Sequence, residues 1–75
     1  MEIKEFIELF ANTIEVDDVQ ALSPETEFRE LDEWSSLTYL MVIVFMDEQF
    51  GVQVEPSEFK KMRTIQDLYN ACIKQ

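Results

Sequence analysis

The chain has 75 residues, and its hydrophobic share of 47% is that of a folded domain rather than of a disordered chain. A chain of this length buries only about 60% of its unfolded surface, so the core is small and a deep, enclosed active site is not expected. The 16 acidic and 6 basic residues give a formal net charge of −10, which excludes nucleic acid as a partner because phosphates are neutralised by Lys and Arg.

The first predicted element is an amphipathic helix from Glu2 to Ile14. Glu2 and Glu5 lie in its first turn, where the helix dipole favours negative charge. Its apolar residues recur at the spacing of one helical face, which we expect to enter the core: Ile3, Phe6, Ile7, Phe10 and Ile14.

Residues 15 to about 34 form a long connection that lacks a helical stripe. The stretch ALSPETEFRELDEW contains a Ser-Pro turn signal, and we interpret it as a loop with room for a helical turn. Four scattered apolar residues are expected to pin this loop to the core: Leu22, Phe28, Leu31 and Trp34.

Charge is distributed unevenly along the chain. Half of the 16 acids fall between positions 15 and 33, beside one base, Arg29. The balance reverses from Lys60 onward, where one acid, Asp67, is accompanied by four bases: Lys60, Lys61, Arg63 and Lys74. The acidic stretch is either a solvated loop or a surface that attracts basic partners.

A second helix is predicted to begin at Ser35 or Ser36 as its cap, to run to about Gln49 and to stop at Gly51. One face has an unbroken apolar stripe and should enter the core: Tyr39, Val42, Ile43, Met46 and Phe50. The opposite face, which also carries Glu48, should stay at least partly exposed: Leu37, Leu40, Met41 and Val44. The apolar run of this helix is too short to span a bilayer.

Two further helices follow. Pro56 suits the first position of a short helix that continues through Phe59 to about Met62. Thr64 then caps a last helix, with Asp67 three residues later as in a capping box. The core stripe of this helix is predicted to be Ile65, Leu68, Tyr69, Cys72 and Ile73.

These elements predict an all-α fold. It is a small four-helix bundle of three main helices plus one short helix, with a long loop between the first two. One Gly and two Pro residues are too few turn residues for a fold of many strands. We expect a single domain over residues 1–75.

Several chemistries lack the residues that they require. The chain has no His and only one Cys, so a Ser–His or Cys–His pair and a zinc site are not available. There is also no glycine-rich loop to hold a phosphate. We therefore expect no catalytic residue, no metal and no enzymatic activity. The lone Cys72 fits a reducing compartment, and no signal segment opens the chain, so we expect a cytoplasmic protein.

The serines at the start of the second helix allow a different chemistry. A hydroxyl on an exposed turn can be modified, and the free N–H groups and dipole of a helix start favour an attached anion. Taken alone, either Ser35 or Ser36 is more simply interpreted as an ordinary N-cap.

The order of short motifs along the chain carries more information than any one of them. FRELDEWSSLTYLMVIVFMDEQFGVQVEP places an acidic loop, a Trp, a Ser-Leu pair and an acid near the end of one helix, and MRTIQDLYNACI adds a Thr-capped helix. Over essentially its whole length the chain resembles acyl carrier proteins of the phosphopantetheine-binding family. The resemblance implies that Ser36, the serine followed by Leu, carries 4′-phosphopantetheine derived from coenzyme A as a phosphodiester.

The resemblance also implies how the protein works. Acyl groups would be held as thioesters on the prosthetic thiol, and partner enzymes would supply the chemistry. These partners are a phosphopantetheinyl transferase and the acyl-activating, acyl-transferring and synthase enzymes of fatty-acid, polyketide or related biosynthesis. We expect a monomer that binds no nucleic acid and does not insert into a membrane.

The second helix is the expected docking surface for these enzymes. The residues involved are Leu37, Leu40, Met41, Val44, Asp47 and Glu48. Its core side is expected to shelter the acyl chain between helices. For Met41 and Val44, ordinary core packing is an equally good interpretation.

Two features depart from the family pattern. Relatives usually have Asp immediately before the modified serine, and here it is Ser35. A transferase that reads the Asp charge would then bind poorly or have to be a specialised one. The helix also has no acid between Leu40 and Met46, so partner recognition should depend more on apolar contact than is common. Two alternatives stay open: an unmodified carrier-like interaction module, and a binder of free lipid.

Overall fold

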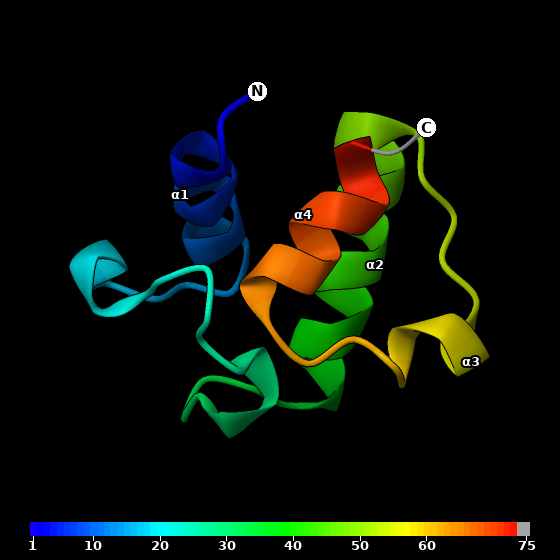
Figure 1. Ribbon diagram of the computed structural model, residues 1–75. Helices are drawn as coiled ribbons and strands as arrows, with labels where there is room; N and C mark the ends of the chain where they lie inside the picture. The colour runs from blue at the N-terminus through cyan, green and yellow to red at the C-terminus, as the bar shows by residue number, and fades with distance from the viewer. Residues whose placement is uncertain (74–75) are drawn as a thin grey trace.

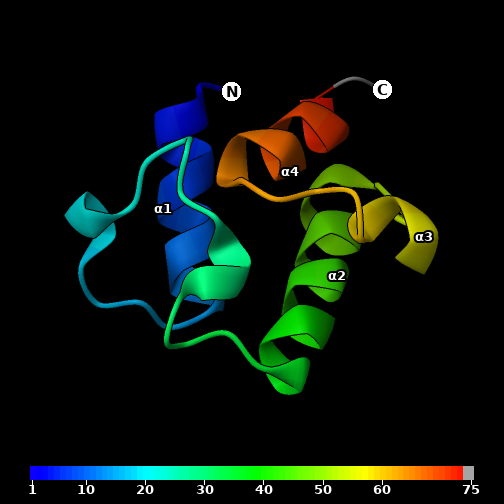
Figure 2. The same ribbon diagram turned by 60° about the horizontal axis from the view of Figure 1, so that its bottom comes forward.

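The computed structural model describes residues 1–73, so Lys74 lies outside the described residues. Its helical elements in chain order, with η for short 3₁₀ turns, are α1 (Ile3–Thr13), η1 (Val19–Ala21), η2 (Phe28–Glu30), α2 (Ser36–Phe50), α3 (Pro56–Phe59) and α4 (Ile65–Ile73). Figures 1 and 2 show α1, α2 and α4 as the body of the bundle, with α3 beside α2 on the side away from α1. The predicted architecture of three main helices and one short helix is confirmed.

The predicted face of α1 is the buried one. Phe6 and Phe10 are completely buried, Ile7 and Ile14 are buried, and Ile3 is half-buried. Because α1 contacts both α2 and α4, this stripe fills the centre of the bundle.

The end of α1 is a Schellman motif. Val16 N–H donates to the carbonyl of Ala11 at 2.9 Å, and Glu15 N–H donates to the carbonyl of Asn12 at 3.4 Å. Glu15 adopts the left-handed conformation that this motif requires, with φ of 60°. A glycine usually occupies such a position, since it has no Cβ to clash there.

The long connection between α1 and α2 is held against the start of α4. Phe28 N–H donates to the Arg63 carbonyl at 3.3 Å, Ile65 N–H to the Thr26 carbonyl at 3.1 Å, and Gln66 N–H to the Pro24 carbonyl at 3.0 Å. Of the expected apolar anchors, Phe28 and Leu22 are buried, and Leu31 and Trp34 are half-buried against the core: the pinned loop is confirmed. It contains two helical turns, η1 and η2.

Helix α2 divides its faces as predicted, but two of its buried residues were not expected. Val42 and Met46 are completely buried, and the rest of the predicted core stripe is half-buried: Tyr39, Ile43 and Phe50. The opposite face is exposed by 69% at Leu37, 57% at Leu40 and 51% at Val44, with Met41 half-buried. Phe45 and Thr38 are also buried in α2, although the apolar stripe did not predict their burial.

The omission of Phe45 has a physical reason. Its ring lies 5.9 Å from that of Phe6 and 5.7 Å from that of Phe50, so it belongs to an aromatic cluster between α1 and α2. Neighbouring apolar residues cover the whole circumference of this helix, and periodicity alone then does not separate the buried face from the exposed one.

Helices α3 and α4 correct two details. The short helix ends at Phe59, and a turn replaces the predicted continuation to Met62. In α4 the core residues are Ile65, Leu68 and Cys72, whereas Ile73 is 47% exposed and its predicted burial was wrong. At 3.6 residues per turn, position 73 lies about a quarter turn away from the centre of that stripe.

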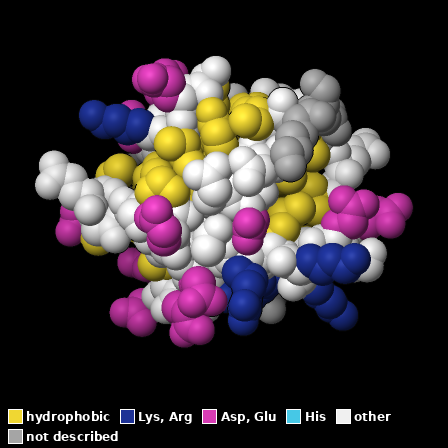
Figure 3. All heavy atoms as spheres, in the orientation of Figure 1, with side chains coloured by type: hydrophobic (Ala, Val, Ile, Leu, Met, Phe, Trp, Pro, Cys, Tyr) yellow, Lys and Arg dark blue, Asp and Glu magenta, His cyan; other side chains and the backbone are white. Residues whose placement is uncertain are grey.

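Acidic side chains are spread widely over the surface. Figure 3 shows many of them at the left and lower left and others at the top and right edge, with several basic side chains at the lower centre and lower right, on the side where α3 lies in Figure 1. No helix in the described part of the chain combines the length and the apolar content that crossing a membrane requires.

Candidate functional site

Ser35, not Ser36, is the N-cap of α2. Its backbone is extended, and its Oγ accepts a hydrogen bond from Thr38 N–H at 3.2 Å. Ser35 Oγ also lies 2.9 Å from Thr38 Oγ1, and the Thr38 hydroxyl donates to the Glu33 carbonyl at 2.8 Å. Since the Thr38 proton is used in that bond, the Ser35 hydroxyl donates to Thr38 Oγ1. The Ser35 side chain is therefore engaged as both donor and acceptor.

Ser36 is the first residue of α2 and is exposed. The start of α2 is the lower end of this helix in Figure 1, at the same end of the bundle as η2. The structure thus gives the two adjacent serines separate situations: Ser35 closes the first turn, and Ser36 stands in it.

A hollow of about 390 Å³ opens beside both serines. Its walls come from three separate parts of the chain, namely η2, the start of α2 with the two residues before it, and α3 with the residue after it. They are Arg29, Trp34, Ser35, Ser36, Tyr39, Pro56, Phe59 and Lys60.

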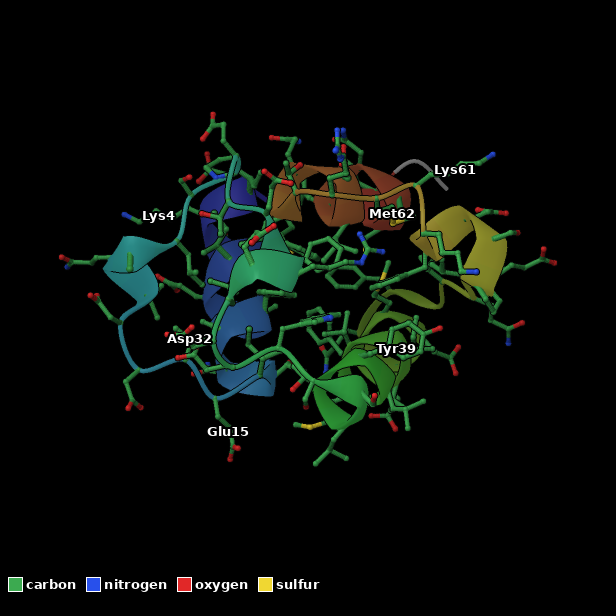
Figure 4. The ribbon with its side chains drawn as sticks, turned by 90° about the horizontal axis from the view of Figure 1, so that it is seen from below. Lys4, Glu15, Asp32, Tyr39, Lys61 and Met62 are labelled. Atoms are coloured by element: carbon green, nitrogen blue, oxygen red, sulfur yellow. The ribbon has the colours of Figure 1, made fainter. Side chains whose placement is uncertain are left out.

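Three aromatic rings form the apolar wall of this hollow. The Trp34 and Phe59 rings are nearly parallel, at 9° and 6.2 Å between centroids. Tyr39, labelled in Figure 4, meets the Phe59 ring edge-on at 4.9 Å. These contacts join α3 to the start of α2, and T-shaped and stacked pairs of this kind are each worth about 0.5–1.5 kcal/mol beyond their buried area.

Arg29 fixes the position of α3 in this wall. Its guanidinium lies 4.9 Å from the centre of the Phe28 ring and 5.1 Å from that of Phe59. It donates to the Phe59 carbonyl at 2.6 Å and to the Met62 carbonyl. The one base of the acidic stretch is therefore a bridge between η2 and the end of α3, and it brings positive charge to the hollow.

A second hollow, of about 430 Å³, lies on the exposed face of α2. It is lined by Thr13, Leu40, Met41, Val44, Phe45, Glu48 and Gln49. The structure brings four of the predicted docking residues together there and leaves Leu37 and Asp47 outside it, although both are exposed on the same helix. We call the four docking residues Leu40, Met41, Val44 and Glu48, together with the exposed Leu37, the α2 surface.

Outside these two hollows, the structure offers neither a reactive thiol nor a metal-binding cluster within residues 1–73. Cys72 is buried, and this burial raises the pKa of its thiol to about 11, so the thiol is protonated at neutral pH. Within residues 1–73, no group of three or more Cys, Asp or Glu side chains is placed to hold a metal ion.

Comparison with known proteins shows the family to which the chain belongs. A family model described as "Phosphopantetheine attachment site" matches residues 4–72. The chain belongs to this phosphopantetheine-binding family. It is also 33% identical over 51 residues to an acyl carrier protein of Thermosynechococcus vestitus (strain NIES-2133 / IAM M-273 / BP-1), which covers 68% of this chain and 63% of that protein.

Members of the phosphopantetheine-binding family are carriers and are not themselves catalytic. The cofactor that membership implies is covalently attached 4′-phosphopantetheine, which agrees with the expectation from the sequence. The residues around Ser36 fit such a group. An exposed hydroxyl is available, Arg29 and Lys60 bring positive charge for a phosphodiester, none of the lining residues is acidic, and the aromatic wall suits aliphatic carbon.

Three residues of this site that lie outside α2 were not predicted from the sequence to belong to it: Arg29, Phe59 and Lys60. Arg29 was noted only as a base among acids, and Lys60 only as one of several bases near the end of the chain. Phe59 was seen as part of a short helix. An apolar residue followed by a basic one, as at Phe59-Lys60, does not indicate which helix end the pair lies beside. That depends on how α3 packs.

Proposed function

We propose that the protein is an acyl carrier protein that holds acyl intermediates as thioesters on a 4′-phosphopantetheine arm attached to Ser36. The observation that carries the proposal is the family match over residues 4–72, which includes an exposed serine, followed by Leu37, at the first position of α2. The engaged hydroxyl of Ser35 favours Ser36 of the two. The chain is then no enzyme: it presents cargo, and partner enzymes carry out the chemistry.

The partners that we propose are a phosphopantetheinyl transferase and acyl-activating, acyl-transferring or synthase enzymes of fatty-acid, polyketide or related biosynthesis. They would dock on the α2 surface together with Asp47 at its end. Three exposed apolar residues in one helix face, Leu37, Leu40 and Val44, support this surface. The single buried Cys72 is compatible with a reducing compartment, and we propose the cytoplasm.

Intact mass spectrometry tests the attachment. The wild-type protein is incubated with coenzyme A and a broad-specificity phosphopantetheinyl transferase, and the gain of one phosphopantetheine mass is expected. Ser36→Ala should show no gain, and Ser35→Ala should still show it. A gain that persists in Ser36→Ala would move the site elsewhere, and the absence of a gain in the wild-type protein would reject the proposal.

A second candidate is an unmodified, carrier-like interaction module. It is favoured by Ser35, which stands where relatives have an Asp that a transferase can read, and by the exposed leucines of the α2 surface. This alternative predicts that the protein isolated from its own cell has the mass of the bare chain, and that its partners bind wild type and Ser36→Ala equally. Endogenous protein carrying the arm would rule it out.

A further inference from the structure

The hollow beside Ser36 is shaped by parts of the chain that no motif connects. Its aromatic wall is contributed by Trp34, Tyr39 and Phe59, and its cations by Arg29 and Lys60, in a chain whose net charge is −10. No acid lines it. A site with this lining selects a ligand that is anionic at one end and aliphatic at the other.

The group that meets this hollow first is fixed by covalent geometry. Whatever is esterified to the Ser36 hydroxyl begins at the hollow, because Ser36 is one of its lining residues. In a 4′-phosphopantetheine arm the first group is a negatively charged phosphodiester, and a CH2 group then leads to a quaternary carbon that bears two methyl groups. The order of charge and hydrocarbon along the arm matches the cations and the aromatic wall.

We propose that this hollow is a seat for the base of the arm, with Lys60 meeting the phosphodiester and Trp34, Tyr39 and Phe59 packing against the dimethyl carbon. The inference rests on the proposed attachment at Ser36. The base of the arm then packs against α3 and does not move freely. The thiol end extends away from this contact.

The two cations have different tasks in this seat. The guanidinium of Arg29 is already bonded to the carbonyls of Phe59 and Met62 and is stacked on two rings, so it contributes charge from a fixed position. Lys60 is exposed, follows Phe59 directly, and carries its ammonium on a flexible stem that can reach an attached anion.

The chain supplies a matched control and a reporter. Lys61 is the adjacent lysine and is also exposed, but it lines another part of the surface, with Asp67 and Asn70, and Figure 4 shows it pointing outward. Trp34 is the one tryptophan of the chain, is half-buried, and lies in the wall of the seat. Its fluorescence therefore reports on this hollow.

The experiment compares acrylamide quenching of Trp34 before and after loading, in wild type, Lys60→Ala, Lys60→Arg and Lys61→Ala. Complete loading is first established by intact mass, and folding by circular dichroism. Loading is expected to reduce quenching in wild type and in Lys61→Ala, because the arm covers the indole. Most of this reduction should be lost in Lys60→Ala and restored in Lys60→Arg. About 1 M NaCl, where the Debye length is about 3 Å, should also abolish it in wild type.

Each outcome bears on a different statement. Absence of a mass gain rejects the attachment, and the seat with it. A complete mass gain without any change in Trp34 quenching rejects the seat and leaves the attachment intact. Equal behaviour of Lys60→Ala and Lys61→Ala rejects the contact between Lys60 and the phosphodiester. If Lys60→Ala is not loaded, the salt titration of loaded wild type replaces it. Loss of the reduction in quenching at high salt supports a phosphodiester held by charge, and no effect of salt rejects it.

Discussion

Ser35 and Thr38 are joined by two hydrogen bonds at the first turn of α2, one from Thr38 N–H to Ser35 Oγ at 3.2 Å and one between the two hydroxyls at 2.9 Å. The second requires a proton on residue 35, since the Thr38 hydroxyl donates to the Glu33 carbonyl. An ionised Asp accepts but does not donate. Ser35 is thus matched to a buried threonine three residues later.

The first prediction concerns this cap. Ser35→Ala should lower the free energy of unfolding by about 1 kcal/mol, since it removes the acceptor for Thr38 N–H. Ser35→Asp keeps that acceptor and adds charge at the helix N-terminus, but it loses the hydroxyl bond to Thr38, so its stability should stay close to that of wild type. Urea unfolding followed by circular dichroism measures both. Equal stability of Ser35→Ala and wild type would contradict this account of the cap.

Glu15 provides a prediction of increased stability. Its φ of 60° is unfavourable for a residue with a Cβ, so Glu15→Gly should raise the free energy of unfolding by about 0.5–1 kcal/mol. Figure 4 shows the Glu15 side chain pointing away from the protein, so no contact is lost. Asp18→Gly removes the same charge at a residue with φ of −99° and should not stabilise. Thermal melts of the two variants make the comparison, and parallel shifts would show a charge effect instead.

Asp67 makes stability depend on acid pH. Its carboxylate accepts hydrogen bonds from Arg63 N–H at 2.9 Å and Thr64 N–H at 3.1 Å, and these bonds hold the pKa of Asp67 below its ordinary value. A group whose pKa is lower in the folded state stabilises the fold above its unfolded pKa of about 3.9, and this stabilisation disappears as the pH falls through the folded value.

The variant Asp67→Asn tests this dependence. It should be less stable than wild type by up to about 1 kcal/mol at pH 6, because a charge-assisted bond to the helix start is lost, and the gap should close as the pH falls below about 4. Glu58→Gln, which removes another carboxylate of the same surface, is the control. A gap that stays constant down to low pH would show that the ionisation of Asp67 is not involved.

Cys72 should be almost inert in the folded protein. Its thiol is buried and has its pKa raised to about 11, so the reactive thiolate is scarce at pH 8. We expect slow alkylation of the unloaded protein by iodoacetamide, followed by mass, and fast alkylation in denaturing urea. The unloaded form is needed because the arm has a thiol of its own. Equal rates with and without urea would show that the thiol is accessible.

The α2 surface should contribute to partner recognition without contributing to stability. Leu40 is 57% exposed, so Leu40→Ser should change the free energy of unfolding by no more than about 0.5 kcal/mol. The rate at which a partner enzyme uses the protein should fall, since an apolar docking contact is removed. Ile73→Ser, at a residue of α4 that is 47% exposed, is the matched control. Similar kinetics for the two variants would argue against docking on α2.

Local patterns were sufficient for the elements themselves. Four features depend on interactions within a few residues of the chain: the 3.6-residue stripe of α1, the Thr64–Asp67 capping box, Pro56 at the start of α3 and Gly51 after α2. Such short-range interactions are written in the sequence and could be predicted from it. Burial at the edges of a stripe could not, as Ile73 and Phe45 show, because it depends on which neighbours cover a position.

The candidate site divides along the same line. The sequence by itself determined that a Ser-Leu pair begins the second helix and that the chain resembles the phosphopantetheine-binding family, since both depend on residue order. Only the tertiary structure decided that Arg29 and Lys60, which are far apart in the sequence, both line the hollow beside Ser36. That meeting requires the acidic loop to pair with the start of α4 and α3 to pack on Tyr39, and such long-range contacts are selected by the packing of the whole bundle rather than by any local pattern.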